Sequence, residues 1–133
     1  MIQTATPKKV LIVDDDETIG DLIRLVLSEE AMYDTYLATN PYQALELAST
    51  HTFDLFILDY RLTYFDGFTL YDRLHTIDRY RDVPAIMISS SIRQQEKALK
   101  KRNLIGIGKP FDMDMLLNTV HNVIDNQVVQ SRR

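Results

Sequence analysis

The chain has 133 residues, a length that favours one compact domain, and 45% of them are hydrophobic, which is enough to build a core. The formal net charge of −4 argues against a surface specialised for nucleic acid, and the absence of cysteine excludes disulfides, thiolate metal ligands and a cysteine nucleophile. No apolar run approaches the roughly 20 residues of a membrane helix, and the first residues lack a signal-peptide core. We therefore expect a cytoplasmic domain that binds neither membrane nor nucleic acid directly.

Two kinds of segment alternate along the chain. Short runs rich in β-branched or aromatic residues indicate strands, and between them apolar residues recur at the three- and four-residue spacing of helices. Asn40 followed by Pro41 is a typical helix start, with the asparagine as cap and the proline in the first helical position. In chain order, the pattern predicts strand 10–13, helix 19–26, strand 35–38, a helix from 41, strand 53–58, helix 67–77, strand 85–88, helix 94–102, strand 104–107 and helix 113–120.

The predicted strands are continuously apolar. In a strand with one solvent-exposed face, apolar and polar residues would alternate. The continuous pattern is typical of strands covered on both faces, and therefore of a parallel sheet with helices on either side. Five strand–helix units predict an α/β fold with a doubly wound five-stranded parallel sheet in the flavodoxin-like order 2-1-3-4-5. We expect the domain to cover residues 8–126, with a flexible N-terminal arm at 1–7 and a flexible C-terminal tail at 127–133.

Acidic residues end or follow two of the expected strands. Asp14 and Asp15 follow the first strand and Asp59 ends the third. These strands are neighbours in the predicted order, so the three carboxylates should share one pocket at the carboxyl edge of the sheet. Two carboxylates about 4 Å apart repel by roughly 4 kcal/mol at an effective dielectric near 20. Such a group must take up protons, bind a cation, or both, and carboxylates without histidine or cysteine favour magnesium.

Two further strand ends bring a hydroxyl and an ammonium group to the same edge. Ser89 follows the fourth strand, and Lys109 follows the fifth. Three carboxylates, a hydroxyl and a lysine suit phosphoryl transfer to an aspartate. Asp59 is the expected nucleophile, because Asp14 and Asp15 are adjacent in the sequence and are suited to hold a metal.

Plainer interpretations exist for several of these residues. Acidic residues after a strand can cap the next helix, and Asp16 is expected to do so. Ser90 and Ser91 are expected to be turn or cap residues, and Lys109 without its neighbours would be an ordinary surface lysine. A basic run is expected to be a solvated face that binds no nucleic acid, and it consists of Lys97, Lys100, Lys101 and Arg102.

Four segments in order resemble the motifs of bacterial response-regulator receiver domains. They are "VLIVDDDET", "FDLFILDYRLTYFDGF", "VPAIMISSS" and "GKPF", and the resemblance covers nearly the whole chain. It implies a stand-alone domain similar to chemotaxis regulators, with Asp59 as phosphoacceptor, Ser89 as switch hydroxyl and Lys109 as the cation that pairs with the phosphoryl group. The resemblance also implies a magnesium site made by Asp14, Asp15, Asp59 and the main-chain carbonyl of Arg61, and a cis Lys109–Pro110 bond.

Three features depart from the family pattern. Thr63 and Tyr64 stand where Pro-Gly is usual, so the loop after the acceptor is expected to be shaped differently. Gly106 stands where an aromatic residue normally swings inward, so the usual aromatic readout is in question. The face of the fourth helix and fifth strand is expected to be more apolar than usual, which does not support a salt-bridged dimer there.

The resemblance implies a domain that takes a phosphoryl group from a phosphohistidine, on a sensor histidine kinase or a histidine phosphotransfer protein, and then changes its contacts with a protein target. Such a domain is a signalling phosphoacceptor and not an enzyme in the usual sense. One alternative is an interaction module of the same fold that no longer switches. Another is an aspartate-nucleophile phosphatase of the haloacid-dehalogenase type, whose Asp-x-Asp-x-Thr start fits residues 14–18 but which needs a longer chain.

Overall fold

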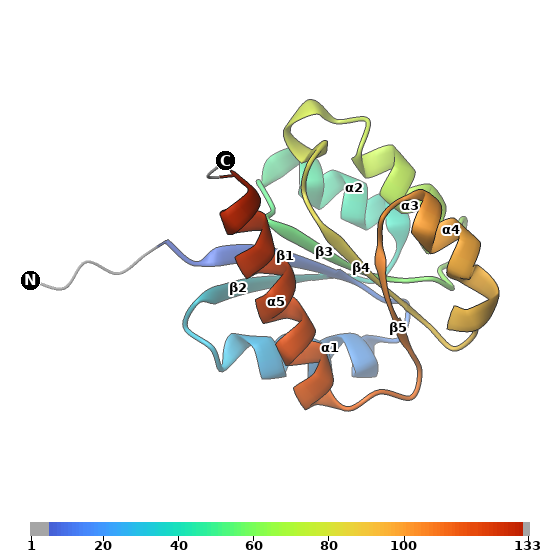
Figure 1. Cartoon of the computed structure of the whole chain (residues 1–133), viewed down its shortest axis with the longest axis horizontal. Coiled ribbons are helices and arrows are strands. Elements are labelled where there is room, and N and C mark those ends of the chain that lie inside the picture. The colour runs from blue at the N-terminus through green and yellow to red at the C-terminus, as the bar shows by residue number, and fades with distance from the viewer. Residues whose placement is uncertain (1–5, 132–133) are drawn as a thin grey trace, which may run out of the picture.

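A computed structural model describes residues 6–131, and side chains for residues 6–126, as a central sheet between two layers of helices (Figure 1). The strands are β1 (Lys8–Val13), β2 (Tyr33–Ala38), β3 (Leu55–Asp59), β4 (Ala85–Ser89) and β5 (Ile105–Gly108). The helices are α1 (Glu17–Ser28), α2 (Pro41–Thr50), α3 (Gly67–Leu74), α4 (Glu96–Lys101) and α5 (Met113–Ser131), with short 3-10 helices η1 (Asp78–Tyr80) and η2 (Ile92–Gln95).

The sheet is parallel with the order β2-β1-β3-β4-β5, which confirms the predicted topology. Alternate residues of β1 enter two separate hydrophobic cores. Leu11 and Val13 pack in the core under α2, α3 and α4, while Val10 and Ile12 pack in the core under α1 and α5. The strand is continuously apolar because both of its faces are buried.

Three helices begin at residues whose side chains cap them. The carboxylate of Asp16 accepts the main-chain N–H groups of Thr18 and Ile19, which confirms Asp16 as the cap of α1. Asn40 caps α2 directly before Pro41, and Asp66 caps α3.

Two helices differ from their predicted bounds. The third ends at Leu74 and not at 77, because the chain turns there into η1. The fourth was expected as one helix over 94–102, but it starts as the 3-10 turn η2 and continues as the six-residue α4. Neither segment has a capping side chain, and 3-10 turns are frequent at the ends of α-helices.

Helix α5 continues to Ser131, past the predicted domain end at 126. Residues 1–5 of the predicted N-terminal arm lie outside the described part, so the flexibility of both ends stays a prediction. No helix within residues 6–131 is long and apolar enough to span a bilayer.

Candidate functional site

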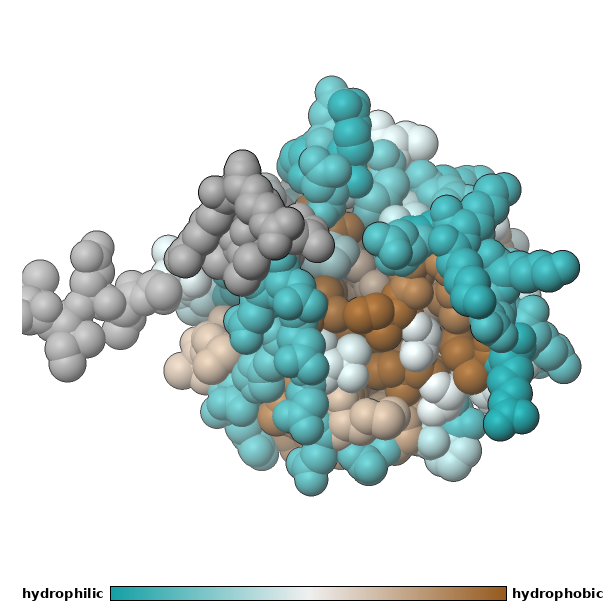
Figure 2. Space-filling model, in the orientation of Figure 1, coloured by the Kyte–Doolittle hydropathy of each residue, from teal (hydrophilic) through white to brown (hydrophobic). Residues whose placement is uncertain are grey.

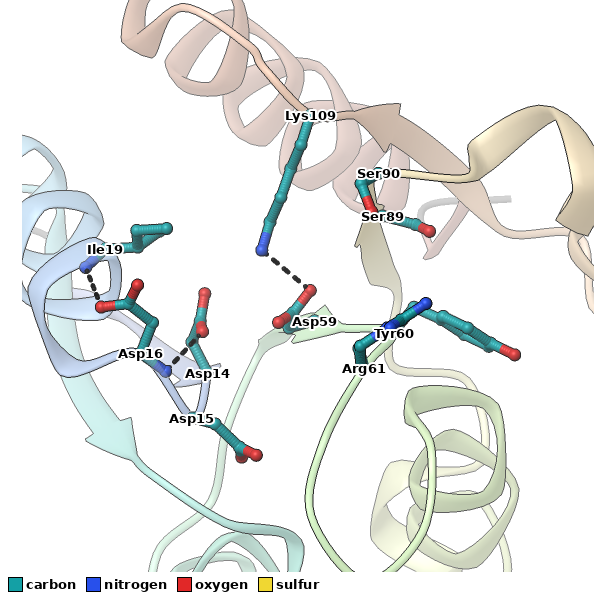
Figure 3. Close-up of a pocket in the computed structure, with 10 residues that line it drawn as sticks. All are labelled: Asp14, Asp15, Asp16, Ile19, Asp59, Tyr60, Arg61, Ser89, Ser90 and Lys109. Carbon is teal, nitrogen blue, oxygen red and sulfur yellow. Dashed lines mark hydrogen bonds and ion pairs between the residues drawn. The ribbon is translucent and has the colours of Figure 1, made fainter.

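The carboxyl ends of β1, β3, β4 and β5 meet at one edge of the sheet and surround a cavity of about 210 Å³ (Figure 3). Strand order reverses at β1 and β3, which is where open parallel sheets bind ligands. All of the residues that the sequence assigned to the site line this cavity. The lining residues are Asp14, Asp15, Asp16, Ile19, Asp59, Tyr60, Arg61, Ser89, Ser90 and Lys109.

Asp59 ends β3 with a side chain that is almost fully buried and paired with a lysine. Asp59 is 7% exposed, and its Oδ1 lies 3.2 Å from Nζ of Lys109. Burial raises the pKa of Asp59, while the ammonium group of Lys109 opposes that rise. Lys109 therefore favours the ionised form of Asp59, which is the form that can act as a nucleophile.

Asp14, at the end of β1, is a second buried carboxylate in the cavity. It is 2% exposed and accepts the main-chain N–H of Asp16 at 2.9 Å. Burial raises the pKa of Asp14 to about 6, and the negative charge of Asp59 contributes further to the rise. The ordinary value is 3.8, so Asp14 binds a proton more tightly in the folded protein than in the unfolded chain.

This pKa shift predicts how stability depends on pH when no divalent cation is present. Because the pKa of Asp14 is raised on folding, its contribution to stability falls as the pH rises from about 4 to about 6. Asp14→Asn keeps the shape of the side chain without its charge. At pH 7 we expect it to raise the free energy of unfolding by on the order of 2–3 kcal/mol, and at pH 4 to change it little. Urea unfolding of both proteins at the two pH values measures this difference, and an equal change at both would contradict it.

Asp15 lines the same cavity, but its carboxylate points away from Asp59 (Figure 3). Its Oδ2 accepts the main-chain N–H of Thr63 at 2.7 Å, and its Oδ1 is buried without a hydrogen-bond partner. A buried carboxylate oxygen without a partner is costly. A cation or an ordered water at this oxygen would remove that cost.

The donor set of the cavity fits a hard divalent cation. Within residues 6–126, no group of three acidic or histidine side chains converges closely enough to hold a metal as the side chains now lie. Asp14, Asp59 and Arg61 nevertheless line one cavity, and Asp15 brings an unpartnered buried oxygen to it. Oxygen donors without nitrogen or sulfur favour magnesium over zinc or copper. The residues present therefore suit magnesium, with Asp15 joining the set only by a change in its present orientation.

Ser89 ends β4 with a buried hydroxyl that is turned away from Asp59 (Figure 3). The hydroxyl oxygen accepts the main-chain N–H of Ser91 at 3.0 Å and lies 3.2 Å from Oγ of Ser91. Oγ of Ser91 also accepts Nε2 of Gln95 at 2.7 Å. Ser91 was expected to be a turn residue, and Gln95 was not singled out at all. The four-residue spacing of Ser91 and Gln95, which places side chains together in a helical turn, was the available signal.

The expectation of a fully solvated basic run is correct for three of its four residues. Lys97, Lys100 and Lys101 are exposed. Arg102 is half-buried, donates two hydrogen bonds to the carboxylate of Asp72 at 2.9 and 2.8 Å, and lies over the ring of Phe68. Arg102 therefore joins the end of α4 to α3, and its assignment to the solvated face was wrong.

A model of the family described as "response regulator receiver domain" matches residues 10–121. The chain belongs to this family. Receiver domains are signalling phosphoacceptors of two-component systems and generally bind Mg²⁺ at their acidic site. The resemblance that the four sequence motifs indicated is therefore confirmed.

Two curated proteins and one solved structure illustrate how far the likeness extends. The DNA-binding dual master transcriptional regulator RpaA of Synechocystis is 33% identical to this receiver domain over 118 residues, which are 87% of this chain and 48% of that regulator. Sporulation initiation phosphotransferase F of Bacillus subtilis is 30% identical over 113 residues, or 85% of this chain and 90% of that protein. The structure of the Francisella response regulator 1452 receiver domain has a TM-score of 0.79 and 29% identity, and covers 90% of this chain and 98% of its own. This receiver domain thus spans about half of RpaA and nearly all of the other two.

Two departures from the family pattern have a visible structural result. Tyr64 has a positive φ of 72°, so it adopts the left-handed conformation of a glycine while carrying an exposed side chain. Its ring makes an edge contact with Tyr42. At Gly106, a β-carbon would lie 2.6 Å from Cδ1 of Ile92 and 2.7 Å from Cδ1 of Leu99. Side chains from η2 and α4 therefore occupy the space beside this glycine.

Proposed function

We propose that this receiver domain accepts a phosphoryl group on Asp59 from a phosphohistidine of a sensor histidine kinase or a histidine phosphotransfer protein, in a magnesium-dependent reaction. The observation that carries the proposal is the ion pair between the buried carboxylate of Asp59 and the ammonium group of Lys109. It lies in a cavity that Asp14 and Ser89 also line. The phosphorylated domain then changes its contacts with a downstream protein.

The proposed chemistry assigns one role to each side chain. A carboxylate oxygen of Asp59 attacks phosphorus, the phosphorus–nitrogen bond of the donor breaks, and the imidazole leaves with the electron pair and takes up a proton. Lys109 balances charge on the phosphoryl oxygens, and Ser89 donates a hydrogen bond to one of them.

The proposed magnesium site consists of Asp14, Asp15, Asp59 and the main-chain carbonyl of Arg61. When bound there, the ion neutralises negative charge on the phosphoryl group. We further propose that the domain turns over no substrate other than its own phosphoryl group, and that it acts in the cytoplasm on protein partners, without binding nucleic acid or membrane directly.

Intact-mass measurement after mixing the protein with magnesium and a small phosphodonor tests this function. We expect the wild-type protein to gain one phosphoryl group and Asp59→Asn to gain none, since the amide lacks the nucleophilic oxygen. Asp54→Asn, which changes a carboxylate in the loop before β3, is the matched control and should still be modified. An adduct that survives Asp59→Asn, or no adduct on the wild-type protein, would refute the proposal.

One observation favours the alternative of a module that no longer switches. Ile92 and Leu99 already fill the space at Gly106, and glycine has no side chain to swing inward. On this alternative, phosphorylation of Asp59 would leave Ile92 where it is. The position of Ile92 with and without a phosphoryl mimic therefore separates the two functions.

A further inference from the structure

The segment that connects β4 to α4 contains a partly buried polar relay. It runs from Oγ of Ser89 to Oγ of Ser91 at 3.2 Å, and from there to Nε2 of Gln95 at 2.7 Å. Gln95 is 8% exposed, and its Oε1 is buried without a hydrogen-bond partner. Burial of a half-satisfied amide costs free energy, so its hydrogen bond to Ser91 is the compensating interaction that holds Gln95 in place.

The hydroxyl of Ser89, which phosphoryl transfer would need, is already engaged in this relay. Ser89 accepts the main-chain N–H of Ser91 and contacts the Ser91 hydroxyl, so its own hydroxyl is oriented toward this segment. A phosphoryl group on Asp59 would present anionic oxygens, which are stronger acceptors than a neutral hydroxyl. Ser89 can contact that group only by turning away from Ser91, and the turn breaks the relay.

The same segment is fixed at a second point by apolar packing. Ile92 follows Ser91 and covers both glycines of β5, since added β-carbons would lie 2.6 Å from Ile92 Cδ1 at Gly106 and 3.1 Å from Ile92 Cγ2 at Gly108. Figure 2 shows apolar surface over β5, between the hydrophilic side chains of α4 and α5. Ile105 of β5 is 46% exposed. The face was expected to be apolar, and a displacement of Ile92 would change its shape.

We propose that Ser91 and Gln95 are positioning residues that hold the Ser89 hydroxyl away from Asp59, and that release of their relay displaces Ile92 from its present place beside Gly106. The inference rests on the proposed function of Asp59. It assigns to η2 the conformational readout that a side chain on β5 cannot provide here. Hydrogen bonds of ordinary net strength would bias Ser89 toward its present position by about five- to tenfold.

Adjacent glutamines offer a matched pair of variants. Gln95→Leu removes the bond between Gln95 and Ser91 while filling the same buried space, and Gln94→Leu changes an exposed side chain that has no part in the relay. The probe is fluoroberyllate, a phosphoryl mimic, added with magnesium. We expect Gln95→Leu to bind it about fivefold more tightly than the wild-type protein, because Gln95 no longer holds the Ser91 hydroxyl in place and releasing Ser89 costs less. We expect Gln94→Leu to bind it as the wild type does.

Methyl NMR of Ile92 gives a second readout that a purely structural role would not move in the same way. In the wild-type protein the Ile92 methyl signals should shift on addition of fluoroberyllate. In unliganded Gln95→Leu they should already lie part of the way toward that position. Ser91→Ala removes the middle of the relay, and it tests the inference if Gln95→Leu fails to fold. The double variant should gain no more affinity than Ser91→Ala alone, because Ser91→Ala already removes the bond to Gln95.

The possible failures are distinguishable. If the wild-type protein binds no fluoroberyllate and forms no phosphoryl adduct, the proposed function of Asp59 is wrong and the inference falls with it. If the wild type binds but both relay variants bind with unchanged affinity, only the inference is overturned. If affinity rises in the variants while the Ile92 signals never move, the relay restrains Ser89 but η2 is not the readout.

Discussion

Replacing Lys109 by methionine is expected to slow phosphoryl transfer to Asp59 by about 100-fold, the effect typical of removing one charged or hydrogen-bonding group from a transition state. Nζ of Lys109 is 3.2 Å from the Asp59 carboxylate and lines the same cavity. Methionine keeps the length of the side chain but removes the charge that would balance the incoming phosphoryl group. It also leaves Asp59 as a buried acid without its cation.

The second effect gives this prediction a pH signature. Burial raises the pKa of Asp59 and Lys109 lowers it, so the pKa rises further in Lys109→Met. The rate deficit should therefore grow as the pH is lowered, because less Asp59 is ionised in the variant. Rates of mass gain at several pH values measure this dependence. Lys97→Met, which changes an exposed lysine of α4, is the control, and an equal deficit in both variants would contradict a specific role for Lys109.

Gly67→Ala is expected to cost the fold about 2–4 kcal/mol and to disturb the acceptor. Gly67 is the first residue of α3 and donates its N–H to the carbonyl of Tyr60 at 2.8 Å. An added β-carbon would lie 2.5 Å from the carbonyl oxygen of Asp59 and 3.1 Å from Cα of Tyr60. These are backbone atoms of the acceptor and of the residue that follows it, and they cannot move aside without displacing the acceptor.

Gly20→Ala is the matched control, because its added β-carbon would meet only the end of a flexible side chain. The nearest atom is Cδ1 of Leu37 at 2.6 Å, and the residue lies inside α1, where alanine gains about 1 kcal/mol of helix propensity. We expect Gly20→Ala to change stability by less than about 1 kcal/mol. Urea unfolding of both variants measures the difference, and the amount of phosphoryl adduct on Gly67→Ala reports the displacement of Asp59. Equal stabilities would show that the backbone at Asp59 and Tyr60 moves aside at little cost.

The fold was predictable because strands that are buried on both faces are continuously apolar in the sequence. Leu11 and Val13 face one core and Val10 and Ile12 the other, so a continuous apolar run indicates a strand covered on both sides. Helix ends were less predictable. The bounds of α3 and α4 depend on a turn into η1 and on the absence of caps, and neither leaves a periodic pattern.

The site was predictable as a set of neighbours but not in its orientations. Strand order alone places Asp14, Asp59 and Lys109 at one edge, and the structure brings them to one cavity. Strand order could not show that the carboxylate of Asp15 would accept the N–H of Thr63, because that bond depends on the shape of a loop. Nor could it distinguish Arg102 from its lysine neighbours, since the difference is a partner 30 positions away, Asp72.

The bond between Arg102 and Asp72 gives the two ends of the β4–α4 region unequal freedom. The C-terminal end of α4 is fastened to α3 by a bidentate ion pair and by the ring of Phe68, while its N-terminal side depends on Ser91, Gln95 and Ile92. If the bond between Ser91 and Gln95 breaks, α4 can rotate about its C-terminal end, which the ion pair of Arg102 and Asp72 still holds. We therefore expect the largest displacement near Ile92 and almost none at Arg102, so that α4 would act as a short lever.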